Sequence, residues 1–392
     1  MCKSALGRVA HDRHPCRDYL LNISCTILGI TALDVGFFQY AFRITPHAAD
    51  VMLKMRGIAN EPDILACHAG FHREVPMQFR ALGRSSLRVA PLCIGGNVFG
   101  WTADESASYA VLDGLVASGL NFIDTADVYS RWAPGHRGGE SETVIGNWLK
   151  RSGKRKDVVI ATKVGMEMAP DRKGLSAAHI ARSVEESLRR LQTDYIDLYF
   201  SHCDDSNVPF EETLAAYQKL IDQGKVRAIG ASNYAAARLS AALGVSRKRG
   251  LPRYEVVQPQ YNLYQRFEYE AALEPMCLER HIGVISYSAL ASGFLSGKYR
   301  TPADATKSAR GAGVVAKFLN KRGLRILAAL DDVGRRYGTS PSSIALAWQI
   351  ARPSITAPIA SATTIAQLDQ LVAATQLKLT PADIEQLNTS SA

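Results

Sequence analysis

Three short apolar segments of this chain each end in a polar residue, and these residues follow one another at equal intervals. They are Asp124, Lys163 and His202, 39 positions apart at each step. An interval of this length accommodates one strand and one helix, and repeated strand and helix units form parallel sheets. If the units close into a barrel, these three residues and Tyr129, five positions after Asp124, emerge at one rim, where barrel enzymes carry their active sites.

The rest of the chain continues this alternation. Predicted strands cover residues 91–95, 122–124, 158–163, 194–202, 226–232, 256–261, 283–290 and 355–359. Predicted helices cover residues 105–118, 141–150, 180–191, 210–223, 235–243, 268–280, 320–337, 340–352, 364–375 and 381–388. A hairpin over residues 79–89 could plug the closed end of the barrel. The pattern therefore favours an α/β fold, a single (β/α)8 barrel over residues 77–392 with extra helices near the C-terminus.

The first 76 residues differ in character from the remainder, and we interpret them as a poorly ordered N-terminal extension. They hold four of the seven cysteines. The moderately apolar run at residues 19–40 is interrupted by Asn22 and Asp34, so it is a poor signal segment or membrane span. An alternative is upstream sequence translated from an early start, because Met77 directly precedes the recognisable domain.

Charge and cysteine content exclude several classes of function. The formal net charge of +9 is modest for 392 residues and is spread among acidic residues, so we predict no nucleic-acid partner. It suits an enzyme whose cofactor carries phosphates. The seven cysteines show no CxxC or Cys/His spacing, which predicts no metal site and no disulfide framework and favours a reducing compartment such as the cytoplasm.

The predicted strand ends share a polar character that calls for a common site. These ends are Asp124, Lys163, His202, Ser232 with Asn233, Gln258, and Tyr287 with Ser288. Burying so many polar groups at one rim is costly unless they meet each other or a ligand.

Tyr129 is the expected proton donor of this site. A free phenol titrates near pH 10, and an ammonium beside it should lower that pKa, so Lys163 is assigned this role. Asp124 would keep the lysine charged, and His202 would hydrogen-bond and position the substrate oxygen. These four side chains suit the protonation of a carbonyl oxygen while a hydride is transferred to its carbon.

No side chain supplies a hydride, so a nicotinamide cofactor is required. The chain has no GxGxxG after a strand, and the cofactor would lie across the barrel rim instead. Asn233 and Gln258 could bind its carboxamide, and Tyr287 could stack on its ring. Lys298 and Arg310 could meet its phosphates, together with the amides at the start of the helix near residues 361–367.

At this point a family resemblance is evident. The segments FRALGRSSLRVAPLCIGGNVFG, DTADVY, IATK, LYFSH, IGASN, QPQYNL and SYSALASGFLSGKY stand in the order and spacing typical of aldo-keto reductases. The chain from about residue 77 to 392 resembles that family, near bacterial members of the aryl-alcohol dehydrogenase and potassium-channel β-subunit branches. The resemblance implies a (β/α)8 barrel, bound NADPH and a catalytic tetrad of Asp124, Tyr129, Lys163 and His202. It further implies cofactor contacts at Gly96, Asn97, Asp124, Ser232, Asn233, Gln258, Tyr287, Ser288, Ala289, Leu290, Gly293, Lys298, Arg310, Ser361, Ala362, Thr363 and Gln367.

The cofactor segment departs from the family pattern. Ser361 stands where many relatives have Gly, and no Lys or Arg occurs over residues 361–371 to bind a 2′-phosphate. Gln370 and Leu371 stand in place of the usual Glu and Asn near the adenine. We retain NADPH as the expected cofactor, with NADH possible and with Thr363 and Gln367 as contacts.

Three functions compete for this constellation. The main one is reduction of a small-molecule aldehyde or ketone, with no membrane partner. The others are a cofactor-sensing subunit resembling potassium-channel β subunits, and an isomerase or aldolase using Lys163 as a Schiff base, which needs that lysine unpaired. The sequence does not specify the substrate, the physiological direction of the reaction or the oligomeric state. Candidate residues for an apolar substrate pocket, each equally consistent with ordinary loop packing, are Trp132, Val98, Phe99, Tyr264 and Phe294.

Overall fold

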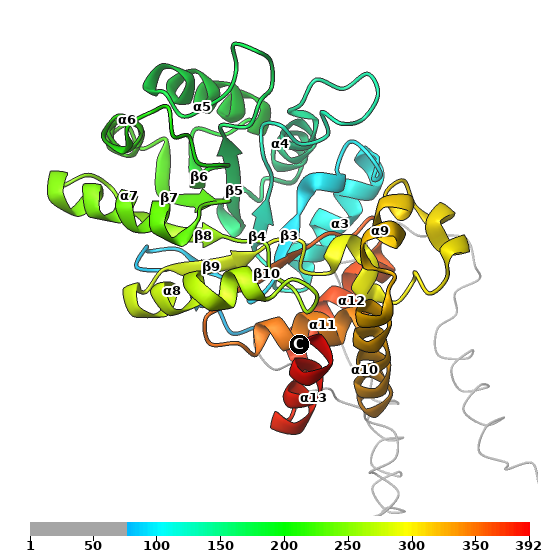
Figure 1. Ribbon diagram of the computed structural model, residues 1–392. Helices are drawn as coiled ribbons and strands as arrows, with labels where there is room; N and C mark the ends of the chain where they lie inside the picture. Colours follow the sequence, from blue (N-terminus) through cyan, green and yellow to red (C-terminus); the bar gives the residue numbers. More distant parts are fainter. Residues whose placement is uncertain (1–76) are drawn as a thin grey trace, which may run out of the picture. The chain divides into compact units, whose positions relative to one another are not determined.

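The computed structural model describes residues 77–392, which form a closed parallel barrel (Figure 1). Its strands are β3 (Cys93–Gly95), β4 (Phe122–Asp124), β5 (Val159–Val164), β6 (Ile196–Ser201), β7 (Val226–Ser232), β8 (Tyr254–Gln258), β9 (Gly283–Ser286) and β10 (Ala357–Ala360). They pair in sequence order, and β10 closes the barrel by pairing with β3. The predicted (β/α)8 fold is confirmed.

The helices pack around the strands and cover the barrel. They are α3 (Glu105–Ala117), α4 (Glu140–Ser152), α5 (Ala177–Leu191), α6 (Phe210–Asp222), α7 (Ala236–Arg249), α8 (Glu274–Arg280), α9 (Gly311–Phe318), α10 (Lys321–Tyr337), α11 (Pro341–Ile350), α12 (Ile365–Gln376) and α13 (Pro381–Ser391). Polar side chains cap many of their starts: the hydroxyl of Thr364 accepts from the Gln367 amide at α12, for example. Because strands and helices pack against each other, most strand residues are buried on both faces.

A small hairpin closes the barrel at the end opposite the polar strand tips, as predicted. It consists of β1 (Arg80–Ala81) and β2 (Arg88–Val89), and its Leu82, Leu87 and Val89 join the inner barrel core. Gly83 sits in the tight turn at φ +59°, where an added Cβ would lie 2.2 Å from the carbonyl oxygen of Glu255. Only glycine fits this approach of the hairpin to the start of β8.

The long connection between β9 and β10 differs from the sequence prediction. The sequence predicts one additional helix there, α10, and a loop before it. The structure places η4 (Ala291–Ser296), η5 (Pro302–Lys307) and α9 within that loop. The glycines at 311 and 313 favour a loop in the sequence prediction. In the structure, Gly311 approaches Ala305 so closely that an added Cβ would lie 2.1 Å from the Ala305 carbonyl oxygen. Close packing, rather than a turn, explains that glycine.

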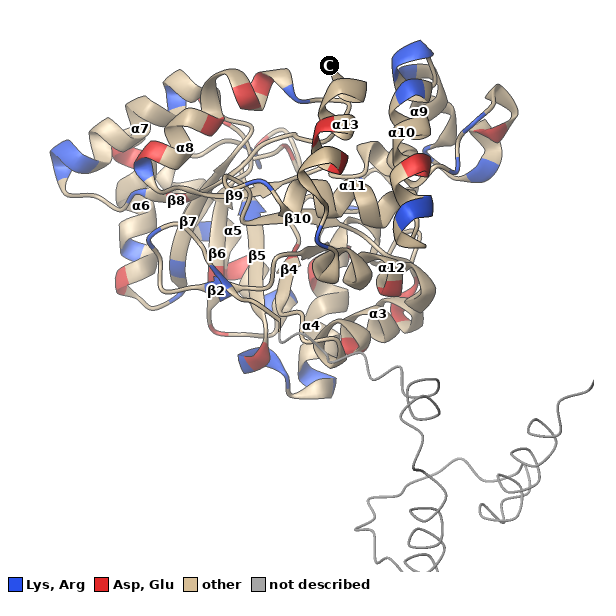
Figure 2. Cartoon of the chain, turned by 90° about the horizontal axis from the view of Figure 1, so that it is seen from below, with Lys and Arg blue, Asp and Glu red and all other residues tan. Residues whose placement is uncertain are grey.

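Basic and acidic residues are interspersed over the described surface (Figure 2). One short basic cluster ends α7, at Arg247, Lys248 and Arg249. Over residues 77–392, no helix is both long and apolar enough to cross a membrane. The predictions made for residues 1–76, including the apolar run at 19–40, lie outside the described residues.

A protein that begins at Met77 should fold and retain activity. The reason is that residues 77–392 close the barrel among themselves and bury their own core. The test compares thermal unfolding midpoints and enzymatic rates of the truncated and full-length proteins. An insoluble or inactive truncated protein would show that the extension contributes to folding or to the site.

Candidate active site

The barrel places the four predicted catalytic residues at one rim. Asp124 ends β4, Lys163 lies near the end of β5, and His202 directly follows β6. Tyr129 is carried by the turn after β4, whose first residues continue the ladder with β5: the Asp127 amide donates to the Lys163 carbonyl oxygen at 3.3 Å. Adjacent parallel strands thus bring together residues that lie far apart in the sequence.

The Lys163 ammonium is the centre of the cluster. Its Nζ donates to Asp124 Oδ2 at 2.7 Å, to the Tyr129 hydroxyl oxygen at 2.8 Å and to the Thr125 carbonyl oxygen at 2.7 Å. The Tyr129 hydroxyl in turn donates to Asp124 Oδ2 at 3.1 Å. All three donors of the ammonium are therefore used, and one of them points at the phenol oxygen.

A second set of predicted residues surrounds this cluster. Gln258 Nε2 donates to the other oxygen of Asp124, Oδ1, at 2.8 Å. Asn233 Nδ2 donates to the His202 carbonyl oxygen at 2.9 Å, and the Tyr287 hydroxyl donates to Asn233 Oδ1 at 2.6 Å. The residues expected to hold the nicotinamide thus belong to the same hydrogen-bond network as the tetrad.

The electrostatics of Tyr129 differ from the sequence expectation. Burial, and after it the charge of the neighbouring Asp124, hold the pKa of the Tyr129 phenol well above its usual range. Burial also lowers the pKa of Lys163, although Asp124 opposes this effect. The expected lowering of the phenol pKa by Lys163 is therefore outweighed in the free site, because burial disfavours the phenolate. The phenol keeps its proton until an acceptor arrives.

His202 lies beside Tyr129 as a neutral side chain. The two ring centroids are 6.0 Å apart in an edge-on arrangement. Burial, and then the charge of Lys163, hold the pKa of His202 well below its usual range. Its buried Nδ1 has no hydrogen-bonding partner among the described residues. A neutral imidazole beside the phenol suits contact with a polar ligand, since an unpartnered buried nitrogen is costly.

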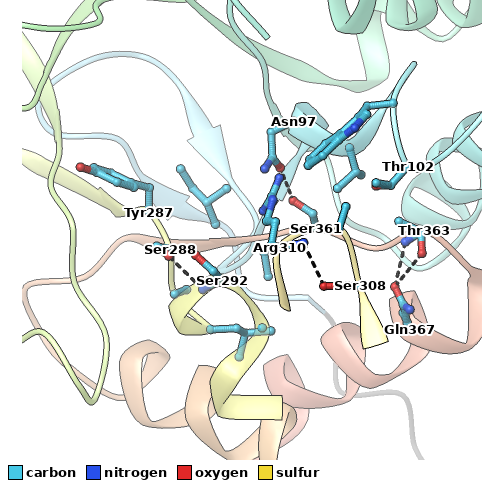
Figure 3. Close-up of a pocket in the computed structure, with 18 of the residues that line it drawn as sticks. Asn97, Thr102, Tyr287, Ser288, Ser292, Ser308, Arg310, Ser361, Thr363 and Gln367 are labelled. Carbon is cyan, nitrogen blue, oxygen red and sulfur yellow. Dashed lines mark hydrogen bonds between the residues drawn. The ribbon is translucent and has the colours of Figure 1, made fainter. Parts of the chain in front are cut away.

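A cavity of about 610 Å³ opens over this cluster (Figure 3). The predicted residues that line it are Asn97, Asp124, Tyr129, Tyr287, Ser288, Ala289, Leu290, Gly293, Lys298, Arg310, Ser361, Thr363 and Gln367. The predicted residues that do not line it are Lys163, His202, Gly96, Ser232, Asn233, Gln258 and Ala362. Two of these residues bond to residues of the wall: Gln258 donates to Asp124 Oδ1 at 2.8 Å, and Asn233 Oδ1 accepts from the Tyr287 hydroxyl at 2.6 Å.

Sequence reasoning missed part of the cavity wall. The missed lining residues are Trp101, Thr102, Gln260, Ser292, Lys307, Ser308, Ala309, Ile359 and Ala360. Most come from the loops after β3 and β9, where no periodic pattern marks which side chain faces inward. Gln260 carried a signal, because it follows Gln258 in the strand-end segment QPQYNL.

Three cations and one carboxylate line the cavity, so the site suits a ligand with several negative charges. Lys307 pairs with Asp304 at 2.7 Å. Lys298 and Arg310 instead lie over the rings of Tyr299 and Trp101, at 5.0 and 4.8 Å, and neither forms an ion pair within residues 77–392. Free cations facing a polar cavity fit the phosphates of a nicotinamide cofactor.

The loop after β9 has an unusual backbone beside these cations. Ser288, Ala291 and Ser292 adopt positive φ values of 52°, 48° and 55°, and Gly293 has φ +90°. Such conformations cost energy for residues other than glycine and concentrate at ligand sites. Within the loop, the Ala291 amide donates to the Ser288 carbonyl oxygen at 2.7 Å and the Gly293 amide donates to the Leu290 carbonyl oxygen at 2.9 Å, which holds this conformation in place.

One end of the cavity is lined by Ser361, Thr363 and Gln367, whereas Gln370 and Leu371, which also depart from the family pattern, do not line it. The Ser361 hydroxyl donates to Asn97 Oδ1 at 2.6 Å, and the Thr363 amide donates to Gln367 Oε1 at 2.9 Å. Gln370 accepts from Ser342 at 3.2 Å, and Leu371 is buried. The contacts available at this end are therefore hydroxyls and amides.

The apolar residues suggested for a substrate pocket separate into two groups. Phe99 and Phe294 are fully buried and pack in the core, with Phe294 stacked on Phe318 at 5.6 Å. Tyr264 packs edge-on against Phe318 at 5.0 Å. Val98 lines the cavity, and Trp132 lies exposed beside Tyr129.

Asp127 is a buried carboxyl group outside the barrel wall, close to the tetrad. Its Oδ1 has no partner among the described residues. Glu142 lies in the same cluster, accepting from Thr162 at 2.5 Å and from Arg190 at 2.7 Å. Burial, and then the charge of Glu142, raise the pKa of Asp127 to about 8. The side chain is therefore a neutral acid at pH 7.

Asp127→Asn should stabilise the protein increasingly as the pH rises. The folded protein keeps the Asp127 proton up to a pKa of about 8, whereas the unfolded chain releases it near pH 4. Asp127 therefore removes stability as the pH rises through this window, and Asn does not. Urea unfolding at pH 5 and pH 9 should show the advantage of the variant growing on the order of a few kcal/mol. An advantage that is equal at both values would refute the assignment.

Comparison with known proteins places these features in context. A model described as "Aldo/keto reductase family" matches residues 91–392. The chain is 34% identical over 319 residues to an uncharacterized oxidoreductase, YrpG, of Bacillus subtilis, covering 80% of this chain and 95% of that protein. It is 34% identical to a probable voltage-gated potassium channel subunit beta of Oryza sativa, covering 73% and 88%. Protein tas of Escherichia coli is 32% identical, covering 77% and 94%.

Proposed function

The chain belongs to the aldo/keto reductase family, an NAD(P)H-dependent oxidoreductase family that acts on carbonyl compounds, and we propose that it reversibly reduces aldehydes or ketones to alcohols with NADPH. One observation carries the proposal: Tyr129 lines the cavity, and its hydroxyl is hydrogen-bonded to both Lys163 and Asp124. The site thus holds a phenolic proton beside a charge that can stabilise the anion left behind.

Tyr129 gives its proton to the substrate oxygen. When the proton leaves, negative charge develops on the phenol oxygen 2.8 Å from the Lys163 ammonium. This interaction is stronger after transfer than before it, so it lowers the barrier rather than merely binding substrate. Asp124 keeps Lys163 charged in a fully buried position, and neutral His202 orients the substrate oxygen.

Bound NADPH supplies the hydride. Gln258, Asn233 and Tyr287 would hold its nicotinamide end, while Lys298 and Arg310 would hold its phosphates. The cations that line the cavity suit the phosphates that NADPH and NADH share, and we favour NADPH on the family resemblance. The 2′-phosphate would be met by Thr363 and Gln367, since no Lys or Arg occurs over residues 361–371.

The experiment titrates the purified full-length protein with NADPH and with NADH, following its intrinsic fluorescence. A panel of aldehydes and ketones is then added while the absorbance of the reduced nicotinamide is recorded. We expect tighter binding of NADPH and carbonyl-dependent loss of absorbance. A protein that binds neither nucleotide, or that turns over no carbonyl compound, would contradict the proposal.

A regulatory subunit is the second candidate function. Relatives from Oryza sativa and Arabidopsis thaliana, 34% and 33% identical, are named as probable voltage-gated potassium channel subunits beta. A cofactor sensor would bind NADPH, and added aldehydes would not cause its repeated oxidation. Multiple turnovers with any aldehyde would exclude this candidate.

The geometry disfavours Schiff-base chemistry at Lys163. Its Nζ uses all its hydrogens in bonds to Asp124, Tyr129 and Thr125, so it is held as an ammonium, not as a free amine. Borohydride added with a carbonyl compound should trap no covalent adduct.

We further propose a cytoplasmic enzyme with a small-molecule substrate and with neither a nucleic-acid nor a membrane partner. Its three described cysteines are free thiols.

A further inference from the structure

The loop after β9 contains a buried backbone amide that has no hydrogen-bond acceptor. Ala289 is fully buried and lines the cavity, yet neither its amide nor the amide of Leu290 donates to an acceptor within residues 77–392. An unpaired buried amide costs free energy, so such groups nearly always find a partner in folded proteins. An acceptor atom brought by a ligand of the cavity would remove this cost.

The carbonyl groups of the same loop are held by two buried side chains. Asn262 Nδ2 donates to the Ser288 carbonyl oxygen at 2.9 Å, and Gln349 Nε2 donates to the Ala289 carbonyl oxygen at 2.9 Å. Both residues are fully buried, and neither lines the cavity. Asn262 and Gln349, which we call the loop clamp, thus hold the loop from outside the site.

The loop clamp is itself fixed by other parts of the barrel. Asn262 Oδ1 accepts from the amides of Tyr264 and Gln265 at 2.8 and 3.0 Å, in the turn after β8. Gln349 lies in α11, and its Oε1 accepts from the Ser286 hydroxyl of β9 at 2.8 Å. Because these bonds fix the orientation of each side-chain amide, its NH2 group faces a carbonyl oxygen of the loop.

The planarity of the peptide bond connects the loop clamp to the unpaired amides. The peptide bonds of this loop are trans, so the C=O group of one residue and the N–H group of the next point in opposite directions. The amides of Ala289 and Leu290 therefore point away from the two clamp side chains. Ser288 adopts φ 52°, which is uncommon outside glycine, and its hydroxyl oxygen accepts from the Ser292 amide at 3.1 Å (Figure 3).

A cation borders the same part of the cavity. An added Cβ at Gly293 of this loop would lie 3.4 Å from Lys298 Nζ, and both residues line the cavity. The charge of an ammonium attracts an anion from many directions, whereas an amide binds an oxygen only along its N–H bond. The orientation of the loop amides therefore adds a directional contribution to the binding of a phosphate.

We propose that the loop clamp consists of positioning residues: it sets the affinity for the nicotinamide nucleotide by aiming the amides of Ala289 and Leu290 at its phosphate oxygens. This inference rests on the proposed function and concerns nucleotide binding rather than the chemical step. The two clamp side chains touch neither the nucleotide nor the substrate. Their bonds hold an uncommon backbone conformation in place before the ligand arrives, so less ordering remains to be done on binding.

The experiment measures the Kd for NADPH by fluorescence titration, and the thermal unfolding midpoint of the full-length protein with and without NADPH. Gln349→Met keeps the length of the side chain and removes both hydrogen-bonding groups. Asn262→Asp keeps the oxygen that accepts from the turn amides and removes the donor to the loop. Thr213→Val is the matched control, because the buried Thr213 hydroxyl donates to the Leu175 carbonyl oxygen at 3.0 Å, outside the cavity wall.

We expect each clamp variant to raise the Kd for NADPH roughly 5- to 20-fold and to reduce the rise of the unfolding midpoint that NADPH produces. At saturating NADPH, kcat should fall by no more than about twofold, because the proton donor is unchanged. Thr213→Val should lower the unfolding midpoint of the free protein and leave the Kd unchanged. This control separates a general loss of stability from a specific loss of nucleotide binding.

Clamp variants that are destabilised but bind NADPH with the wild-type Kd would overturn the inference while leaving the proposed function intact. A fall in kcat at an unchanged Kd would overturn it as well. If Gln349→Met does not fold, Asn262→Asp decides the question from the other side of the loop. A wild-type protein that binds no nicotinamide nucleotide would instead overturn the proposed function and the inference with it.

Discussion

Tyr129→Phe should lower the rate of carbonyl reduction by at least roughly 100-fold while leaving the Kd for NADPH within about twofold of the wild-type value. The change removes a single oxygen, which donates to Asp124 and accepts from Lys163. The ring of Phe would keep its packing against His202 and Trp132. Only the proton donor is lost, so the effect should fall on kcat. The measurement is the steady-state rate combined with a fluorescence titration of the cofactor.

A matched control distinguishes proton donation from the general cost of losing a buried hydroxyl. Tyr217 is fully buried, and its hydroxyl lies 2.9 Å from the Ser201 hydroxyl, away from the cavity. Tyr217→Phe should change activity by no more than a few fold and should mainly lower stability, by about 1 kcal/mol. If both variants lose activity equally, or if Tyr129→Phe acts chiefly by weakening NADPH binding, Tyr129 is not the proton donor.

The gathering of the tetrad could be predicted from the sequence because strand order fixes it. Asp124, Lys163 and His202 end successive apolar runs, and parallel strands deliver their ends to one rim. The observed bonds from Lys163 to Asp124 and Tyr129 agree with that spatial prediction. Their catalytic roles remain to be tested by the variants above and below.

Other features depend on packing that the sequence pattern does not encode. The high pKa of the Tyr129 phenol follows from burial, whereas sequence reasoning considered only the neighbouring ammonium. Trp101 was missed because its loop after β3 has no periodicity, and its inward position is known only from the cavity it lines. Asp127 looks like an ordinary turn residue in the sequence, whereas in the fold it is buried near Glu142 of α4 and Arg190 of α5.

The raised pKa of Tyr129 indicates at which stage of the reaction Tyr129 and Lys163 would each act. Burial keeps the phenol protonated in the free site, and Lys163 favours its anion once a base is present. The lysine therefore matters during proton transfer rather than before it, so removing its charge should affect the rate more than ligand binding.

Lys163→Met should abolish most activity and also destabilise the fold. Without the ammonium, Asp124 remains 1% exposed with no compensating charge at its Oδ2. Removing one partner of a buried ion pair typically costs about 3–5 kcal/mol. The phenolate loses its stabilising charge as well, and we expect the reduction rate to fall by roughly 100- to 1,000-fold. Urea unfolding and single-turnover rates measure the two effects separately.

The double variant Asp124→Asn with Lys163→Met separates the two effects of the lysine. It removes both charges, so it should recover most of the lost stability, whereas activity should stay low because no cation faces the phenol. Lys173→Met is the surface control: Lys173 pairs with Glu167 at 3.0 Å, but both side chains are about half exposed, so its loss should cost under about 1 kcal/mol. Recovery of activity in the double variant would show that Lys163 serves only to neutralise Asp124, and its assigned role of stabilising the Tyr129 phenolate would then be wrong.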